Sequence, residues 1–248
     1  MSAGGPHIAA PSWLREVPLA HRGLHGPEIV ENSRSAFEAA VDAGYGVELD
    51  VQLSADGVPV VFHDDTLERL AGTTDKVSAL TVDELAQVHL LGVDEGVPTL
   101  AEVLGILRDT PTMVELKTSR MRAGRMEAAV AGLLEDHRGP VCVASFNPVP
   151  LRWFRRNAAQ VLRVMTAMVP VGSGVQALVL RRMSELRDAP SIGPVAVSYH
   201  LDSLPQPAVD RWREDGGAVL TWTVTDDEGL QRSREVADNV IFEHVRPT

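Results

Sequence analysis

Short apolar runs rich in β-branched residues alternate along the chain with segments of helical periodicity. The runs predict eight strands, at 17–21, 46–52, 112–117, 141–146, 161–167, 195–200, 219–224 and 240–243. The segments between them predict helices at 33–43, 99–107, 123–137, 205–214 and 226–236. Strands that alternate with helices favour an α/β protein with a closed (β/α)8 TIM barrel. An open doubly wound sheet is the alternative, but the glycine-rich phosphate loop typical of it is missing.

Two segments interrupt this repeat. Residues 52–64 predict a β-hairpin with Asp56-Gly57 at its tip. Residues 64–98 are too long for an ordinary connection and predict a small lid-like insertion after the second-strand hairpin. The length of 248 residues is typical of one barrel, so we expect a single domain over 1–248.

Composition limits the partners of the chain. A formal net charge of −11 argues against nucleic acid and against stable association with an anionic membrane. Residues 1–11 have neither the basic nor the apolar stretch of a signal peptide and predict a loose tail, so we expect a cytoplasmic protein. The single cysteine, Cys142, lies in an apolar run and is expected to be a buried thiol.

Acidic side chains alternate with apolar ones in the second predicted strand. Glu48 and Asp50 are two residues apart, so their side chains point to the same face. A two-residue turn at Asp56-Gly57 would place His63 directly opposite Asp50. This pattern predicts two carboxylates and an imidazole on one face, near the strand end where barrel active sites lie.

The third predicted strand repeats the alternation, with Glu115 and Lys117 on one face. Together with Glu48 and Asp50, Glu115 makes three carboxylates, which would repel one another without a cation among them. Oxygen ligands of this kind favour Mg²⁺ or Ca²⁺ over zinc. The three acids therefore predict a divalent metal site.

The first predicted strand ends in His21-Arg22-Gly23, which adds an imidazole and a guanidinium to the same rim. A histidine or an acid pair at a strand end is commonly structural when it occurs alone, but here the features coincide at successive strand ends. Phosphodiester hydrolysis needs a cation that offsets the charge of the phosphate. It also needs groups that bind the phosphate oxygens, for which Arg22 and Lys117 are suited. His21 and His63 can serve as acid and base.

At these residues the chain resembles the glycerophosphodiester phosphodiesterase family. The matching motifs occur in family order and are His21-Arg22-Gly23, Glu31-Asn32-Ser33, Glu48-Leu49-Asp50-Val51, Asp56-Gly57, Val60-Val61-Phe62-His63-Asp64, Pro98-Thr99-Leu100 with Glu102, Glu115-Leu116-Lys117, Ser145-Phe146 and Trp222-Thr223-Val224. The C-terminal segment 241–247 departs from the family pattern, so an alcohol contact there is in doubt.

This resemblance implies a TIM barrel that hydrolyses small glycerophosphodiesters to glycerol phosphate and an alcohol, in lipid and glycerol metabolism. It also implies that Glu48, Asp50 and Glu115 bind Ca²⁺ or Mg²⁺ and that His21 and His63 are the general acid and base. Arg22 and Lys117 would contact the phosphate. Trp222 would pack on the glycerol moiety, with a place in the barrel core as the alternative.

Two other functions stay open at this point. A lysophospholipase D would use the same groups on an acylated diester, and the apolar residues of 64–98 either line a lipid groove for it or form the core of the insertion. A noncatalytic phosphodiester-binding barrel would bind without turnover. The sequence leaves open the alcohol, the choice among Ca²⁺, Mg²⁺ and Mn²⁺, the histidine that acts as acid, direct water attack or a cyclic phosphate, and the oligomeric state.

Overall fold

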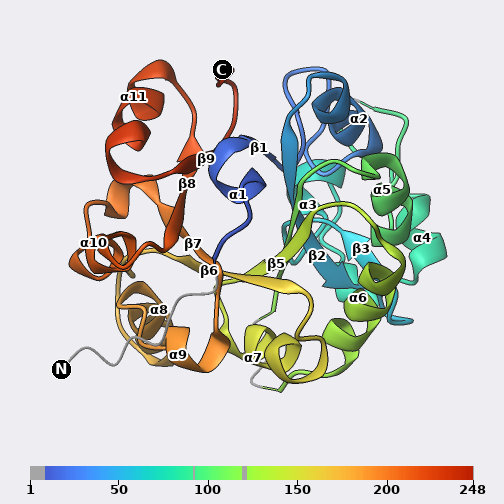
Figure 1. Cartoon of the computed structure of the whole chain (residues 1–248). Coiled ribbons are helices and arrows are strands. Elements are labelled where there is room, and N and C mark those ends of the chain that lie inside the picture. Colours follow the sequence, from blue (N-terminus) through green and yellow to red (C-terminus); the bar gives the residue numbers. More distant parts are fainter. Residues whose placement is uncertain (1–8, 92, 119–121, 248) are drawn as a thin grey trace. The chain divides into compact units, whose positions relative to one another are not determined.

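The structure is a computed structural model that describes residues 9–91, 93–118 and 122–247 (Figure 1). The chain divides into two compact units. The N-terminal unit is Leu19–Val141, and the C-terminal unit is Met1–Pro18 with Cys142–Thr248. Residues 1–8 of the predicted tail lie outside the described residues.

The N-terminal unit is built on the strand β2 (Gly46–Leu53), which pairs in parallel with β1 (Leu19–His21) on one edge and β4 (Thr112–Leu116) on the other. The short strand β3 (Pro59–Val61) pairs antiparallel with β2. Side chains on both faces of β2 are buried, as expected for a parallel strand covered by helices.

The longer helices of this unit are α2 (Arg34–Asp42), α5 (Leu100–Leu107) and α6 (Arg125–Asp136) (Figure 1). Ser33 caps α2 by accepting a hydrogen bond from the backbone N–H of Ala36. Thr99 and Glu102 form a reciprocal capping box at the start of α5. These helices confirm the three predicted at 33–43, 99–107 and 123–137.

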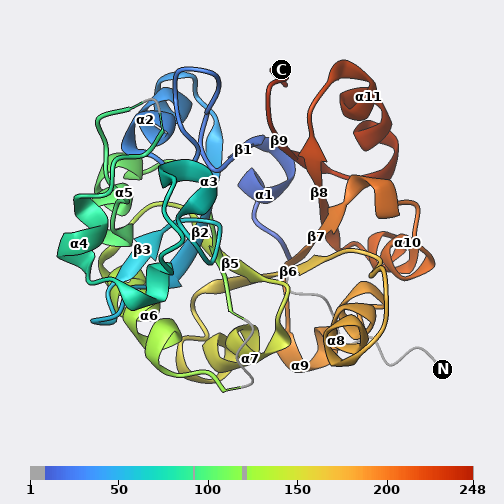
Figure 2. The same cartoon turned by 180° about the vertical axis from the view of Figure 1, so that it is seen from behind.

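The segment 64–98 contains the short helices α3 (Glu68–Ala71), η1 (Val77–Ala79) and α4 (Val82–Ala86). Figure 2 shows α3 and α4 in the region of β3. The apolar side chains of this segment pack with those of the hairpin into one buried cluster, made of Val60, Phe62, Leu67, Leu70, Val77, Leu85, Leu90 and Val97. Of the two roles left open for the apolar residues of the insertion, this packing favours a core of their own.

The hairpin register differs from the predicted one. Val51 pairs with Val61 and Leu53 with Pro59, and Phe62 donates to the carbonyl of Asp50. The expectation that His63 lies directly opposite Asp50 is therefore wrong by one residue. The physical reason is the turn, because Ser54 pairs with Val58 and closes a three-residue loop in which Gly57 has a φ of 90°.

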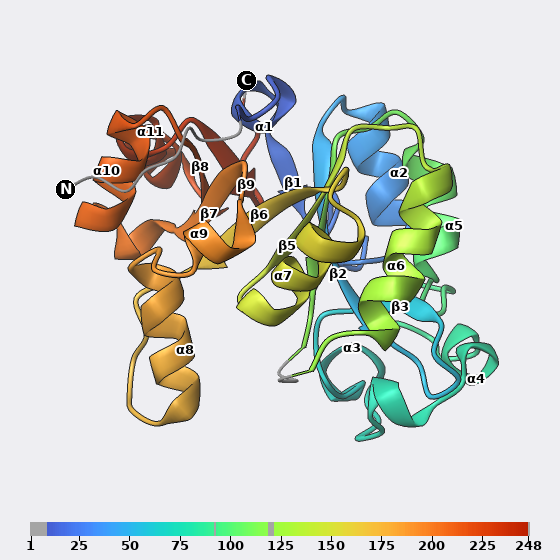
Figure 3. The same cartoon turned by 60° about the horizontal axis from the view of Figure 1, so that its bottom comes forward.

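The C-terminal unit contains five parallel strands among its described residues, and each pairs with the next along the chain. They are β5 (Val141–Ser145), β6 (Leu162–Ala167), β7 (Ala196–His200), β8 (Ala218–Val224) and β9 (Asn239–Phe242). Its helices are α1 (Trp13–Glu16), α7 (Pro148–Asn157), α8 (Val175–Ser184), α9 (Ala189–Ile192), η2 (Leu201–Ser203), α10 (Pro207–Glu214) and α11 (Asp227–Val236). Figure 3 shows α8 projecting from the region of β6. Cys142 is a buried free thiol, as expected.

Strand neighbours follow chain order in both units, with helices between successive strands. This is the order of a (β/α)8 TIM barrel, whereas the order in a doubly wound sheet reverses at a switch point. The predicted fold class is confirmed. Within 9–91, 93–118 and 122–247, none of the helices is both long and apolar enough to span a bilayer.

Candidate metal and active site

Three carboxylates meet at the centre of the N-terminal unit. Glu48 and Asp50 point to the same face of β2, and Glu115 of β4 pairs in register with Asp50. One oxygen from each lies within 4.8 Å of the others, and the three side chains are buried. The three predicted metal ligands are therefore brought together.

Burial makes it costly for all three carboxylates of this cluster to be ionised at once. Burial, together with the charges of Asp50 and Glu115, raises the pKa of Glu48 well above its ordinary value. Burial also raises the pKa of Glu115, against the opposing effect of Lys117. Although burial opposes it, Lys117 and Arg22 lower the pKa of Asp50. A divalent cation among the three oxygens would offset the repulsion, and oxygen donors fit a hard cation.

Two cationic side chains border the carboxylate cluster. Lys117 Nζ lies 3.2 Å from Glu115 Oε1 and 3.6 Å from Asp50 Oδ1. Arg22 Nε lies 3.2 Å from Asp50 Oδ2, and its Nη1 donates to Glu31 Oε1 at 2.7 Å. Both predicted phosphate ligands thus lie beside the cluster, each with donor atoms in addition to those it uses there.

The two histidines also lie near these acids. His21 Nε2 is 3.8 Å from Glu48 Oε2, and both His21 and His63 act electrostatically on Asp50. His63 Nδ1 lies 2.6 Å from Asp64 Oδ1. The pKa of Asp64 is lowered, because hydrogen bonds with Arg69 and His63 outweigh the effect of burial. Since an ionised carboxylate only accepts, Nδ1 of His63 is the donor and Nε2 is left for other partners.

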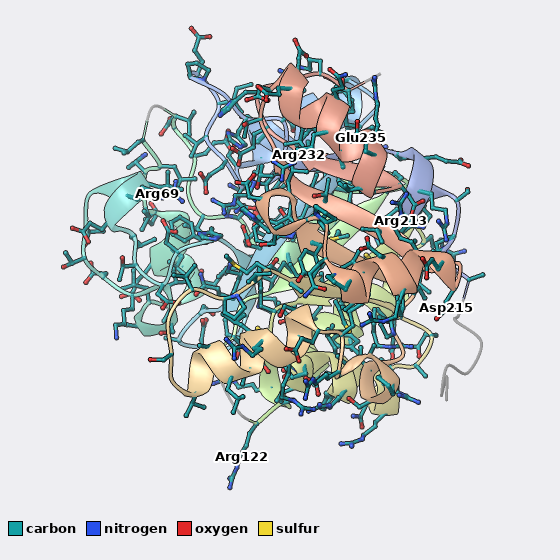
Figure 4. All side chains as sticks on the ribbon, turned by 90° about the vertical axis from the view of Figure 1, so that its left-hand side faces the viewer. Arg69, Arg122, Arg213, Asp215, Arg232 and Glu235 are labelled. Carbon is teal, nitrogen blue, oxygen red and sulfur yellow. The ribbon has the colours of Figure 1, made fainter. Side chains whose placement is uncertain are left out.

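A chain of ion pairs connects His63 to Arg22 through the insertion. Arg69 lies on α3 and is labelled in Figure 4. It donates to Asp64 Oδ2 at 2.7 Å and to both oxygens of Glu31 at 2.7 and 2.8 Å. Glu31 in turn accepts from Arg22. Sequence reasoning assigned no role to Glu31, Asp64 or Arg69, although Glu31 and Asp64 fall inside the matching motifs.

Asn32 is a further residue that sequence reasoning left without a role. Its Nδ2 donates to Asp50 Oδ2 at 3.0 Å, and the side chain is buried. Asn32 has a φ of 56°, a left-handed conformation that asparagine tolerates better than most residues. Nearby, Gly23 has a φ of 81°, and a Cβ there would lie 2.8 Å from the backbone of Ala36. The loop after β1 therefore requires glycine.

Trp222 lies on β8 in the C-terminal unit. Its ring makes edge-to-face contacts with His200, at 4.8 Å between centroids, and with Phe146, at 5.3 Å. His200 is its register partner on β7. The indole is only partly buried, and its Nε1 has no hydrogen-bond partner among the described residues. Trp222 is therefore an aromatic surface with one unused donor.

The chain matches one family over most of its length. The sequence profile of the Glycerophosphoryl diester phosphodiesterase family matches residues 21–245. A glycerophosphodiester phosphodiesterase of Caldanaerobacter subterraneus is 26% identical over 233 residues, which cover 88% of this chain and 90% of that relative.

Solved structures share the fold. One is a phosphodiesterase from Oleispira antarctica in complex with the product sn-glycerol-3-phosphate. It superposes with a TM-score of 0.80 at 24% identity, and the superposition covers 93% of this chain and 94% of that chain. A glycerophosphodiester phosphodiesterase from Thermotoga maritima gives a TM-score of 0.69 at 27% identity, with 90% and 92% covered. The profile match includes the carboxylate cluster, both histidines and most of both units, and the chain therefore belongs to the glycerophosphoryl diester phosphodiesterase family of phosphoric diester hydrolases.

Proposed function

We propose that this protein hydrolyses small glycerophosphodiesters to glycerol phosphate and an alcohol, with the help of a bound divalent cation. The observation that carries the proposal is the buried cluster of Glu48, Asp50 and Glu115, with His21 and His63 close to it. The relative from Oleispira antarctica was solved with sn-glycerol-3-phosphate, and this supports the same product here.

The cation is proposed to be Mg²⁺ or Ca²⁺, held by one oxygen from each of the three acids. All three donors are carboxylates, and hard cations prefer such ligands. A bound cation would offset the charge of the phosphate and of the developing transition state. Arg22 and Lys117 would bind the nonbridging phosphate oxygens with the donors that the cluster does not use.

His21 and His63 are proposed as the general acid and base. One would remove a proton from the attacking hydroxyl, and the other would protonate the departing alcohol. Asp64 would act as a positioning residue, because its bond to Nδ1 of His63 directs Nε2 towards the reaction. The attacking group is either water or a neighbouring glycerol hydroxyl, which would first form a cyclic phosphate.

Trp222 is proposed to pack on the glycerol moiety through its partly exposed ring. The indole is held edge-on by His200 and Phe146, so its orientation is fixed before a substrate binds. We further propose a single barrel domain over 1–248, with an inserted segment 64–98, and a cytoplasmic enzyme.

The test is release of glycerol phosphate from glycerophosphocholine, measured with and without EDTA. We expect turnover that EDTA abolishes and that Mg²⁺, Ca²⁺ or Mn²⁺ restores, and the three cations are compared at equal concentration. Binding of the diester without release would favour the noncatalytic phosphodiester-binding barrel. Equal release in EDTA would refute the metal-dependent proposal.

A lysophospholipase D activity is the second enzymatic candidate. It would need an apolar surface for an acyl chain, but Val77, Leu85 and Leu90 of the insertion are buried in their own cluster. The contacts of these residues therefore favour the small diester. Comparing glycerophosphocholine with lysophosphatidylcholine in the same assay separates the two activities.

A further inference from the structure

A cavity of about 290 Å³ adjoins the carboxylate cluster within the N-terminal unit. Its lining includes Gln52 at the end of β2, Lys117 after β4, and Asp65, Lys76 and Ser78 of the insertion. At about 30 Å³ for each water, this volume holds about ten waters, which is room for a small polar head group.

The cavity shares two wall residues with the site. Lys117 forms ion pairs with Glu115 and Asp50. Gln52 donates through its Nε2 to the carbonyl oxygens of Phe62 at 2.9 Å, His63 at 3.2 Å and Asp64 at 2.7 Å, so it holds the backbone that carries His63. The alcohol half of a diester whose phosphate contacts Lys117 would therefore extend into this cavity.

Two side chains of opposite charge on the insertion face this space. The backbone segments that carry them are joined, because Thr66 and Lys76 form an antiparallel bridge and Val77 donates to the carbonyl of Asp65 at 3.1 Å. Both side chains are exposed, and in the described part of the chain neither Lys76 nor Asp65 forms an ion pair. The wall thus offers one ammonium and one carboxylate without partners.

Lysine is rare in this chain, so the presence of two lysines in the wall of one cavity points to a role for them there. The chain has 23 basic residues, of which only Lys76 and Lys117 are lysines, and both line this cavity. Lys117 is already paired with Glu115 and Asp50, so Lys76 is the ammonium of this wall that a ligand can use.

We propose that this cavity selects a zwitterionic head group that carries both a carboxylate and an ammonium, as in glycerophosphoserine. Lys76 would bind the carboxylate and Asp65 the ammonium, while the hydroxyl of Ser78 adds a polar contact. The inference rests on the proposed function, because it places the departing alcohol of the same reaction.

Three substrates that differ by one charged group test the assignment. Glycerophosphoserine carries both groups, glycerophosphoethanolamine lacks the carboxylate, and glycerophosphoglycerol lacks both. Because both side chains are exposed, each contact is expected to change kcat/KM by about fivefold, the upper range for an exposed ion pair. Wild type should prefer glycerophosphoserine, then glycerophosphoethanolamine, then glycerophosphoglycerol.

Each variant should remove one step of this preference. Lys76→Met should lower kcat/KM for glycerophosphoserine about fivefold and leave glycerophosphoethanolamine unchanged. Asp65→Asn should lower kcat/KM about fivefold for both amine-containing substrates and leave glycerophosphoglycerol unchanged. Asp83→Asn on α4 and Arg211→Met on α10 are the matched controls, since both residues are exposed and line no part of this cavity.

Two results separate the inference from the function beneath it. If wild type cleaves all three diesters with equal kcat/KM, or if Lys76→Met lowers all three equally, the head-group assignment is wrong and the hydrolase stands. If wild type releases no glycerol phosphate from any of them with Mg²⁺, Ca²⁺ or Mn²⁺ present, the proposed function fails and the head-group assignment fails with it.

Discussion

Replacing Asp64 with asparagine tests how His63 is prepared for proton transfer. The ionised carboxylate of Asp64 accepts a hydrogen bond from Nδ1 of His63 at 2.6 Å, which leaves Nε2 free for the reaction. An asparagine amide presents either an oxygen or an NH₂ group to Nδ1. The variant therefore no longer selects one tautomer of the ring.

The magnitude follows from the type of bond and its exposure. A hydrogen bond to a charged group contributes about 1.5–3 kcal/mol. The side chains of His63 and Asp64 are 30% and 26% exposed, so solvent screening favours the lower end of that range. A loss of about 1.5 kcal/mol in the transition state corresponds to about a tenfold fall in kcat.

The assay is release of glycerol phosphate from glycerophosphocholine at saturating cation, with kcat and KM measured separately from pH 5 to 9. Asp83→Asn, on α4 of the same insertion, is the matched control, because it makes the same chemical change at an exposed position. We expect kcat to fall and KM to change little. An Asp64→Asn enzyme with the wild-type kcat at every pH would refute the positioning role.

Three further changes test other parts of the site and the fold. His21→Ala and His63→Ala should each lower kcat by about 10²- to 10⁴-fold, and wild-type turnover in both variants would end the acid/base assignment. Thr99→Ala removes the capping box of α5 and should lower the free energy of unfolding, measured in urea, by about 1 kcal/mol. The control Thr74→Ala, at an exposed position, should leave that free energy unchanged. Equal stability of the two variants would contradict a stabilising role of the cap. Although burial raises it, hydrogen bonds from two arginines lower the pKa of Glu31 below its ordinary value of 4.5. The ionised Glu31 therefore stabilises the fold above about pH 4.5, and this stabilisation is lost as the pH falls further. In Glu31→Gln, the free energy of unfolding should depend less on pH in this acid range. Curves of unfolding free energy against pH that run parallel for wild type and variant from pH 3 to 7 would argue against this role of Glu31.

Period-two alternation was enough to predict the carboxylate cluster. Glu48, Asp50 and Glu115 alternate with apolar residues on strands that are parallel neighbours, so their side chains share one face whatever the loops do. The fold class could be predicted for a similar reason, because the βα repeat is read from periodicity alone. Only the strand order was needed to exclude the open sheet.

The hairpin and the ion-pair chain show where this reasoning stops. The register of β2 and β3 depends on one extra loop residue, which Ser54 accommodates through bonds that the sequence does not reveal. The pair of Arg69 and Glu31 joins residues 38 positions apart and depends on the path of the insertion. Helix α7 was not predicted, because Pro148 and Pro150 are typical of a loop. The first turn of a helix tolerates proline, and α7 begins with Pro148.

Direct measurement of metal binding tests the central claim, that three buried carboxylates hold one divalent cation. Wild type and the variant Glu48→Gln/Asp50→Asn/Glu115→Gln are titrated with Mg²⁺ and with Ca²⁺ by calorimetry, after far-UV circular dichroism has established that the variant is folded. We predict one bound cation per wild-type chain and none in the folded variant. A folded variant that binds the cation as tightly as wild type, or a wild type that binds neither, would contradict the account.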